Sequence, residues 1–186
     1  MTGKSEGVEQ LRSESEAAQP ISLLMAEHKI ILENLEELRR IVSQAKVANS
    51  FDEFGGQLTR LREIAHLLLD TESHHQREEA ALFPRLERYG VTGPPRIMRL
   101  EHEELRARKR RLSELVEQAG STSYEEFVKE LSEVGGYIAN VLRDHILKED
   151  NILYPAALKT LEPQEWPEVL AEFEEIGYCS FTPGKK

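Results

Sequence analysis

The chain has 186 residues, 31% of them charged and 39% hydrophobic, and its formal net charge is −10. This length and balance are typical of one globular domain with a sizeable core, and the negative charge argues against nucleic acid or an anionic membrane as a partner. No apolar run approaches the roughly 20 residues of a membrane-spanning helix. The N-terminal stretch has no apolar signal-peptide core, so we expect a cytoplasmic protein. The single cysteine, Cys179, excludes an internal disulfide and any site built from several thiolates.

The first predicted helix follows a polar lead-in. Residues 1–19 are rich in Ser, Glu and Gln, and we expect them to be disordered or frayed. Pro20 is tolerated in the first turn of a helix, so we expect the helix to open there. Apolar residues then recur at helical spacing as far as Val42, and His28 lies in the same stripe.

The second predicted helix begins at a capping box of Ser50 with Glu53 and runs to about Tyr89. Gly90 ends it, because glycine commonly follows the last turn of a helix. Within this helix His66 shares a face with polar residues, so we expect His66 to be exposed.

Two further helices are predicted after a short connection rich in Gly and Pro. The third starts near Pro95 and closes at Gly120, with His102 in its apolar stripe. The fourth opens at Ser123, which belongs to a second capping box, and runs to about Leu161.

No alternating strand pattern occurs in the sequence, and four long helices joined by short turns are typical of an antiparallel up-down bundle. We therefore predict an all-α fold, with a four-helix bundle over residues 20–162 that is built from a duplicated helical hairpin. A Pro-flanked amphipathic segment indicates a short C-terminal helix and tail over residues 163–186.

The duplication is clearest in two stretches that share one pattern. The first is HHQREEAALFP, from His74 to Pro84, and the second is HILKEDNILYP, from His145 to Pro155. In each, a Glu follows a His by just over one helical turn, so that the imidazole and the carboxylate lie on one helix face and can bind the same ligand. Iron, zinc and manganese ions suit this combination of ligands. Each proline either bends its helix beside the site or begins the helix exit.

The polar residues of these motifs fall in apolar stripes. Upstream of both stretches, Glu27-His28 in the first half is matched by Glu101-His102 in the second. Three of the histidines, His28, His102 and His145, lie in the apolar stripes of different predicted helices, and Glu149 shares the last of these stripes. Buried carboxylates are costly unless they are paired or bound to a metal, and the stripes offer no Lys or Arg at the right depth to neutralise them all. One or two divalent cations would do so.

On these residues the sequence resembles the hemerythrin-like, or HHE cation-binding, domains over about residues 20–160. The resemblance implies a four-helix bundle that holds a non-heme di-iron centre. The metal ligands that it implies are His28, His74, Glu78, His102, His145 and Glu149. The two glutamates would bridge the metals, and the duplication suggests that each half supplies the two histidines of one iron.

One position departs from the pattern of the oxygen-carrying hemerythrins. They place a further His one turn after the third-helix ligand, where this sequence has Arg106. One iron would therefore keep a water molecule or an open position. This departure disfavours dedicated oxygen carriage and favours binding or reduction of O2, nitric oxide or peroxide, or the sensing or holding of iron.

The register of the second helix is left open by the sequence. The heptad upstream points His75 and Glu79 inward, whereas alignment on the prolines of the two repeats favours His74 and Glu78. We expect the pair that does not bind metal to hydrogen-bond the ligands.

Two functional classes remain. The first is a binding module that senses or holds iron or a small diatomic or peroxide ligand, and the second is a di-iron oxidoreductase that detoxifies peroxide or nitric oxide. Turnover would need an unknown electron donor, because no flavin or nicotinamide pattern occurs in the chain, so the binding module is favoured. A ferritin-like site is disfavoured, since Glu72-x-x-His75 fits its motif once but Leu142 precedes His145 at the matching distance.

Overall fold

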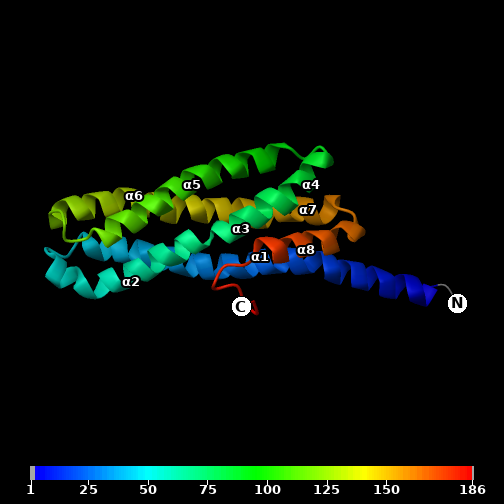
Figure 1. The fold of residues 1–186 in the computed structure, drawn as a ribbon, viewed down its shortest axis with the longest axis horizontal. Coiled ribbons are helices and arrows are strands. Elements are labelled where there is room, and N and C mark those ends of the chain that lie inside the picture. The colour runs from blue at the N-terminus through cyan, green and yellow to red at the C-terminus, as the bar shows by residue number, and fades with distance from the viewer. Residues whose placement is uncertain (1–2, 186) are drawn as a thin grey trace. The chain divides into compact units, whose positions relative to one another are not determined.

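The computed structural model describes the backbone of residues 3–185 and the side chains of residues 19–185. All regular elements in this range are helical, as the sequence predicts, and none of them is a strand (Figure 1). Over the same range no helix combines the length and the apolar character needed to cross a membrane. The chain forms two compact units. Unit 1 comprises Met1–His28, Ser73–Arg99 and Lys148–Lys186, and unit 2 comprises Lys29–Glu72 and Leu100–Leu147.

Two of the long predicted helices are interrupted. The α-helical segments are α1 (Gly3–Ala45), α2 (Phe51–Asp70), α3 (Glu72–Arg77), α4 (Phe83–Arg88), α5 (Gly93–Glu117), α6 (Tyr124–Lys148), α7 (Tyr154–Thr160) and α8 (Trp166–Ile176). The π-helical segments η1 (Glu78–Leu82) and η2 (Glu149–Leu153) separate α3 from α4 and α6 from α7. A short 3-10 turn, η3 (Pro163–Glu165), precedes α8.

The start of α1 differs from the prediction. This helix begins at Gly3 and contains Pro20 in its interior, whereas the sequence places the start at Pro20. An internal proline removes one backbone hydrogen bond, which the neighbouring turns of a long helix can tolerate. The side chains of residues 1–18 lie outside the described part of the chain. The lead-in over residues 1–19 and the division into lead-in, bundle and tail therefore stay predictions.

Capping residues and a glycine explain other helix boundaries. Ser50 Oγ accepts a hydrogen bond from the backbone N–H of Glu53, and Ser123 Oγ accepts one from Glu126, each at 3.3 Å. Both N-caps are thus confirmed. After α4 the chain turns at Gly90, whose φ of 83° lies in the region that favours glycine.

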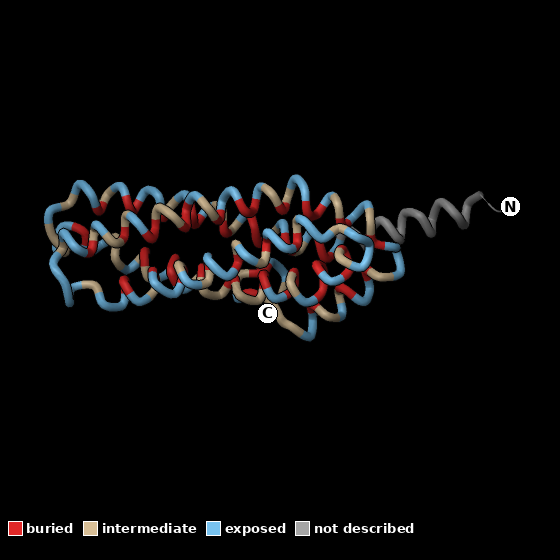
Figure 2. The backbone as a smooth tube through the Cα atoms, turned by 90° about the horizontal axis from the view of Figure 1, so that it is seen from above, coloured by how far each residue is buried: buried red, intermediate tan, exposed pale blue. Residues whose placement is uncertain are grey.

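Unit 2 has an aromatic cluster between the first turns of α2 and α6. The ring centroid of Phe51 lies 5.1 Å from that of Tyr124 and 5.2 Å from that of Phe127. The Tyr124 hydroxyl also donates to the carbonyl of Ala45 at 2.8 Å. The beginning of α6 therefore lies beside the end of α1. Figure 2 shows that buried positions recur along the helices.

The core of unit 1 joins α8 to the helices that carry the repeated motifs. Its buried residues are Ile21, Leu24, Ala81, Leu82, Phe83, Leu86, Met98, Leu153, Tyr154, Ala157, Leu161, Trp166, Val169 and Phe173. Arg85 of α4 adds ion pairs to Glu168 at 3.4 Å and Glu172 at 2.8 Å. Each large apolar side chain buried here contributes roughly 1.5–3 kcal/mol, so α8 is an integral part of this core.

The two π-helical segments occupy equivalent positions in the repeat. The N–H of Phe83 donates to the carbonyl of Glu78, and the N–H of Tyr154 donates to that of Glu149, in each case five residues back. The proline of each repeat then lies in the first turn of α4 or α7, where its missing N–H costs little. Neither proline ends its helix, because a π-helical turn precedes each one and helical structure follows it.

Adjacent glycines of α6 provide a test of how closely unit 2 is packed. A Cβ atom at Gly135 would lie 3.0 Å from Val42 Cγ2, whereas one at Gly136 would meet nothing within 4 Å. We expect Gly136→Ala to raise the free energy of unfolding by about 0.5–1 kcal/mol, because alanine favours the helix, and Gly135→Ala to lower it by about 1 kcal/mol. Urea unfolding measures both changes. Equal stabilisation by the two substitutions would contradict the close packing of α6 against α1.

Candidate metal centre

Unit 1 brings together buried side chains that carry metal-ligand atoms. His28 of α1, His74 of α3 and Glu149 of η2 offer ligand atoms that all lie within 4.8 Å of one another. His28 Nε2 is 3.1 Å from His74 Nε2 and 3.2 Å from Glu149 Oε2. Glu78 of η1, also predicted as a ligand, places Oε2 3.7 Å from His74 Nε2. None of these side chains is more than 2% exposed.

Carboxylates behind the two imidazoles determine which nitrogen faces the site. Glu27 Oε2 lies 2.6 Å from His74 Nδ1, and Asp150 Oδ1 lies 2.8 Å from His28 Nδ1. An ionised carboxylate can only accept, so each Nδ1 donates its proton. The Nε2 atoms are then left to face one another, as in histidines that bind a metal through Nε2.

The two histidines differ in charge when no cation is bound. Burial lowers the pKa of His74 to about 4, so this ring is neutral at pH 7. Burial also opposes the charged form of His28, but hydrogen bonds to Asp150 and Glu149 outweigh it and raise the pKa of His28 to about 9. His28 therefore holds a proton among the surrounding carboxylates, and a metal ion would have to displace that proton.

A tyrosine hydroxyl lies beside the Nε2 atoms of the same two histidines. Tyr154 Oη donates to Glu78 Oε1 at 2.9 Å, and it lies 3.4 Å from His28 Nε2 and 3.5 Å from His74 Nε2. Burial and the nearby carboxylates raise the pKa of Tyr154 well above its usual value, so the hydroxyl keeps its proton. The matching residue of the first repeat is Phe83, which has no hydroxyl. The second repeat thus supplies a proton donor that the first does not.

Backbone irregularity accounts for the ambiguous register of the second predicted helix. His74 and His75 are both 2% exposed, whereas Glu78 is buried and Glu79 is only partly buried. Helix α2 ends before Thr71 and α3 begins after it. The π-helical segment η1 then contains one more residue per turn than an α-helix, which rotates the following side chains about the helix axis. The inward positions therefore change along this stretch. Both histidines end up buried, and Glu78 is the buried glutamate.

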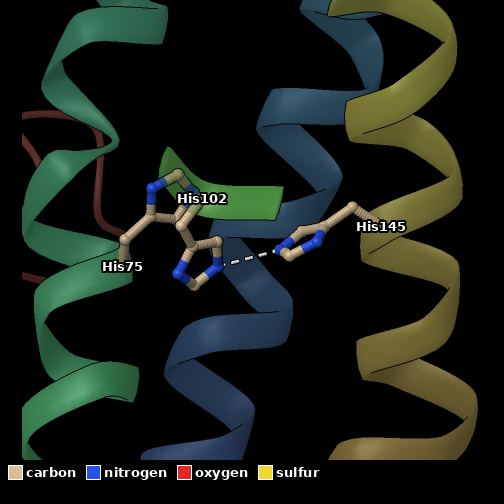
Figure 3. A group of neighbouring side chains, drawn as sticks. All are labelled: His75, His102 and His145. Carbon is tan, nitrogen blue, oxygen red and sulfur yellow. Dashed lines mark hydrogen bonds between the residues drawn. The ribbon is translucent and has the colours of Figure 1, made fainter. Parts of the chain in front are cut away.

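Unit 2 contains a second histidine pair. His102 Nε2 of α5 lies 2.9 Å from His145 Nε2 of α6, and the dashed line in Figure 3 marks this contact. Glu101 Oε2 lies 2.7 Å from His145 Nδ1, which repeats the relation of Glu27 to His74. Both rings are buried, but the Glu101 side chain is 25% exposed. Each half of the chain thus pairs two Nε2 atoms and orients one ring with a carboxylate.

Arg106 and His66 lie on the helices of unit 2. Arg106 Nε donates to both carboxylate oxygens of Glu72, at 3.1 and 2.9 Å. A guanidinium has no lone pair to offer a metal, so Arg106 supplies no ligand. His66 is 68% exposed and lies 3.7 Å from Glu117, which confirms the prediction that it faces solvent.

The donor set in unit 1 fits a hard or borderline divalent cation. Two imidazole nitrogens with carboxylate oxygens are the ligands that iron, zinc and manganese take in proteins. Burial of an ionised carboxylate is costly unless positive charge compensates it, and both Glu78 and Glu149 are buried. A bound cation would provide that compensation.

Sequence patterns identified the buried histidines and glutamates but not the side chains that orient them. The residues missed are Glu27, Asp150, Tyr154 and Glu101. For the two glutamates a signal exists, since a Glu precedes a His in both halves. Each Glu, however, bonds a histidine on another helix and not its neighbour, and spacing along one helix cannot reveal that pairing.

A family model described as the hemerythrin HHE cation binding domain matches residues 19–157. The matched range includes every predicted metal ligand and every orienting side chain described above. A comparison with curated proteins finds no match to the chain.

The buried Glu27 predicts an acid-dependent stability. Burial opposes its ionisation, but the hydrogen bond from His74 and the charge of Arg77 outweigh it and lower the pKa of Glu27 from 4.5 to about 2. Because the folded-state pKa lies below the unfolded-state value, the stabilisation is complete above about pH 4.5 and is lost as the pH falls towards 2. Urea unfolding at pH 6 and pH 2 tests this. The difference in free energy of unfolding between wild type and Glu27→Gln should be roughly 3 kcal/mol larger at pH 6 than at pH 2, in favour of wild type.

The exposed Glu133→Gln variant is the matched control for this measurement, and it should follow the wild-type pH dependence. A Glu27→Gln variant that also follows the wild-type curve would show that Glu27 is not the group responsible.

Proposed function

Since the chain belongs to the hemerythrin HHE cation-binding family, we propose that it is a non-heme di-iron protein in which each histidine pair binds one iron. One observation carries this proposal: in each unit the Nε2 atoms of two buried histidines face one another, at 3.1 Å in unit 1 and 2.9 Å in unit 2. Carboxylates on Nδ1 of His28, His74 and His145 leave the Nε2 atoms of these rings to face the site. Glu78 and Glu149 would act as the bridging ligands that the family resemblance implies.

An antiparallel up-down four-helix bundle is the arrangement that we propose for the long helices. In unit 2, His66 of α2 pairs with Glu117 of α5, and Thr71, just past the end of α2, accepts from Lys109 of α5 at 2.6 Å. Contacts that advance along α2 therefore move backward along α5, which supports opposite directions for these helices. The contact between the first turn of α6 and the end of α1 supports the same conclusion for that pair.

The chemistry follows from what the side chains hold in place. Bound iron would supply an open coordination position for O2, nitric oxide or peroxide and the ability to exchange electrons with it. Glu27 and Asp150 accept hydrogen bonds from the two Nδ1–H groups, so the imidazoles stay oriented. Tyr154 keeps a proton at Oη beside the first histidine pair, where it donates a hydrogen bond to Glu78 Oε1. The pairing of Arg106 with Glu72 is consistent with an open position, because it adds no ligand.

We favour a binding role in sensing, iron handling or a stress response, with a small diatomic or peroxide ligand. The alternative is a di-iron oxidoreductase that detoxifies peroxide or nitric oxide, and the buried Tyr154 hydroxyl favours it as a hydrogen-bond donor beside the histidine pair. Continuous O2 release from hydrogen peroxide by the iron-loaded protein would support the alternative, whereas stoichiometric bleaching would support the binding role. The electron donor stays unknown and the cytoplasmic location stays a prediction.

Metal content tests the proposal directly. After anaerobic reconstitution with Fe(II) and removal of free metal, elemental analysis should find two iron atoms per chain. His102→Ala should retain about half of that iron, because it removes a ligand from one pair only. His66→Ala is the control, since His66 is exposed and should not alter the content. Unchanged iron in His102→Ala would exclude His102 as a ligand.

The Tyr154 hydroxyl predicts a change in ligand affinity without a change in metal content. Tyr154→Phe should keep its iron and release nitric oxide about tenfold faster, because a buried hydrogen bond of about 1.4 kcal/mol is lost. Stopped-flow absorbance measures the release rate. Tyr89→Phe is the matched control, because its hydroxyl bonds Glu165 at an exposed position. Equal release rates in all three proteins would remove Tyr154 from the site.

A further inference from the structure

The C-terminal tail, residues 177–183, packs inside unit 1. α8 is followed by Gly177, where a φ of 93° turns the chain in a conformation that favours glycine. The tail lies beyond the family match, which ends at residue 157. Its Cys179 and Thr182 are only 2% and 3% exposed. In Figure 1 the tail, drawn in red, leaves α8 and runs over α1.

Arg77 of α3 connects the tail to Glu27. The Arg77 guanidinium is fully buried and lies over the rings of Phe173 at 5.3 Å and Tyr178 at 4.9 Å. Its Nη2 atom is 3.7 Å from Cys179 Sγ. The same atom donates to both carboxylate oxygens of Glu27 at 2.7 Å. Arg77 is therefore held by α8 and the tail on one side and by the carboxylate on the other.

Thr182 contacts the same carboxylate directly, because its hydroxyl donates to Glu27 Oε1. Glu27 thus accepts hydrogen bonds from Thr182, Arg77 and His74, and both of its oxygens are used. A carboxylate bonded in this way has one orientation, and the His74 ring that depends on it has one as well.

The carboxylate of the second histidine pair has different surroundings. Glu27 is 0% exposed, whereas Glu101, which bonds His145 in unit 2, is 25% exposed. Water can reach Glu101 and compete for its hydrogen bonds, but it does not reach Glu27. The hydrogen bond that orients the His74 ring is therefore shielded from water, whereas the one that orients the His145 ring is not.

We propose that the C-terminal tail is a positioning element of the metal centre, in which Thr182, together with Arg77, fixes Glu27 and through it the His74 ring. The effect on metal affinity rests on the proposed di-iron function. The effect on the His74 ring does not, because the hydrogen bonds that produce it involve no metal. A ligand that is already oriented binds metal more tightly, and residues that orient ligands typically account for ten- to hundredfold in affinity.

The first test uses the full-length, metal-free protein with 15N-labelled histidine. In Thr182→Val the His74 Nδ1 proton should exchange with water at least several-fold faster, because Glu27 loses one donor and becomes mobile. The His145 Nδ1 proton should not change. Thr182→Ser keeps the hydroxyl and should restore the wild-type rate, and Ser180→Ala, at an exposed position of the same tail, should also match wild type.

An unchanged His74 rate in Thr182→Val would overturn the proposal. Equal acceleration at His145 would overturn it as well, because that result indicates general loosening. The same holds if Thr182→Ser behaves like Thr182→Val, since the hydroxyl would then be irrelevant. If Thr182→Val does not fold, Thr182→Ala serves as the second variant.

The second test is anaerobic titration with Fe(II) against a competing chelator. Thr182→Val should bind one of two iron equivalents about tenfold more weakly and the other with wild-type affinity. Equal weakening of both, or of neither, would overturn the tail's role in metal binding. If wild type itself binds no Fe(II), the di-iron function fails, and the proton-exchange measurement still decides whether the tail positions His74.

Discussion

A hydrogen bond between a carboxylate and the Nδ1 atom of a buried histidine on another helix is the interaction on which the candidate site depends. Glu27 makes it with His74, and Glu101 makes it with His145. The bond selects the tautomer and turns Nε2 towards the facing ring. It requires two helices at a set distance and register, which the apolar packing of each unit provides. Core packing and ligand chemistry are therefore coupled through a single contact in each half of the chain.

The two halves repeat a pattern, but they have not stayed equivalent. Tyr154 stands where the first half has Phe83, so that a hydroxyl reaches the histidine pair of unit 1. Glu27 is closed off from water by Arg77 and the C-terminal tail, whereas Glu101 remains a quarter exposed. The two irons that we propose would thus experience different hydrogen bonding and different solvation. Such differences tune the affinity and redox properties of metal ions.

The π-helical turns show how a regular helix is modified to build the site. Glu78 and Glu149 are the first residues of η1 and η2, and each is buried beside a histidine of unit 1. A π-helical turn shifts every following side chain around the helix axis. In the second predicted helix this shift, together with the break at Thr71, allows both His74 and His75 to be buried. In a helix of uniform period only one of two adjacent histidines would face the core, which is why the sequence presents His74 and His75 as alternatives.

Periodicity, capping and His-x-x-x-Glu spacing are local properties of one helix, and they were enough to predict the helical class, the N-caps at Ser50 and Ser123, and the candidate ligands. Tertiary structure alone decided which carboxylate meets which imidazole and which hydroxyl reaches the site. Thr182 and Glu27 illustrate the difference, since they are 155 residues apart and share no local pattern. Their contact exists because α8 packs into the core of unit 1, and the way distant helices pack is a property of the whole folded chain.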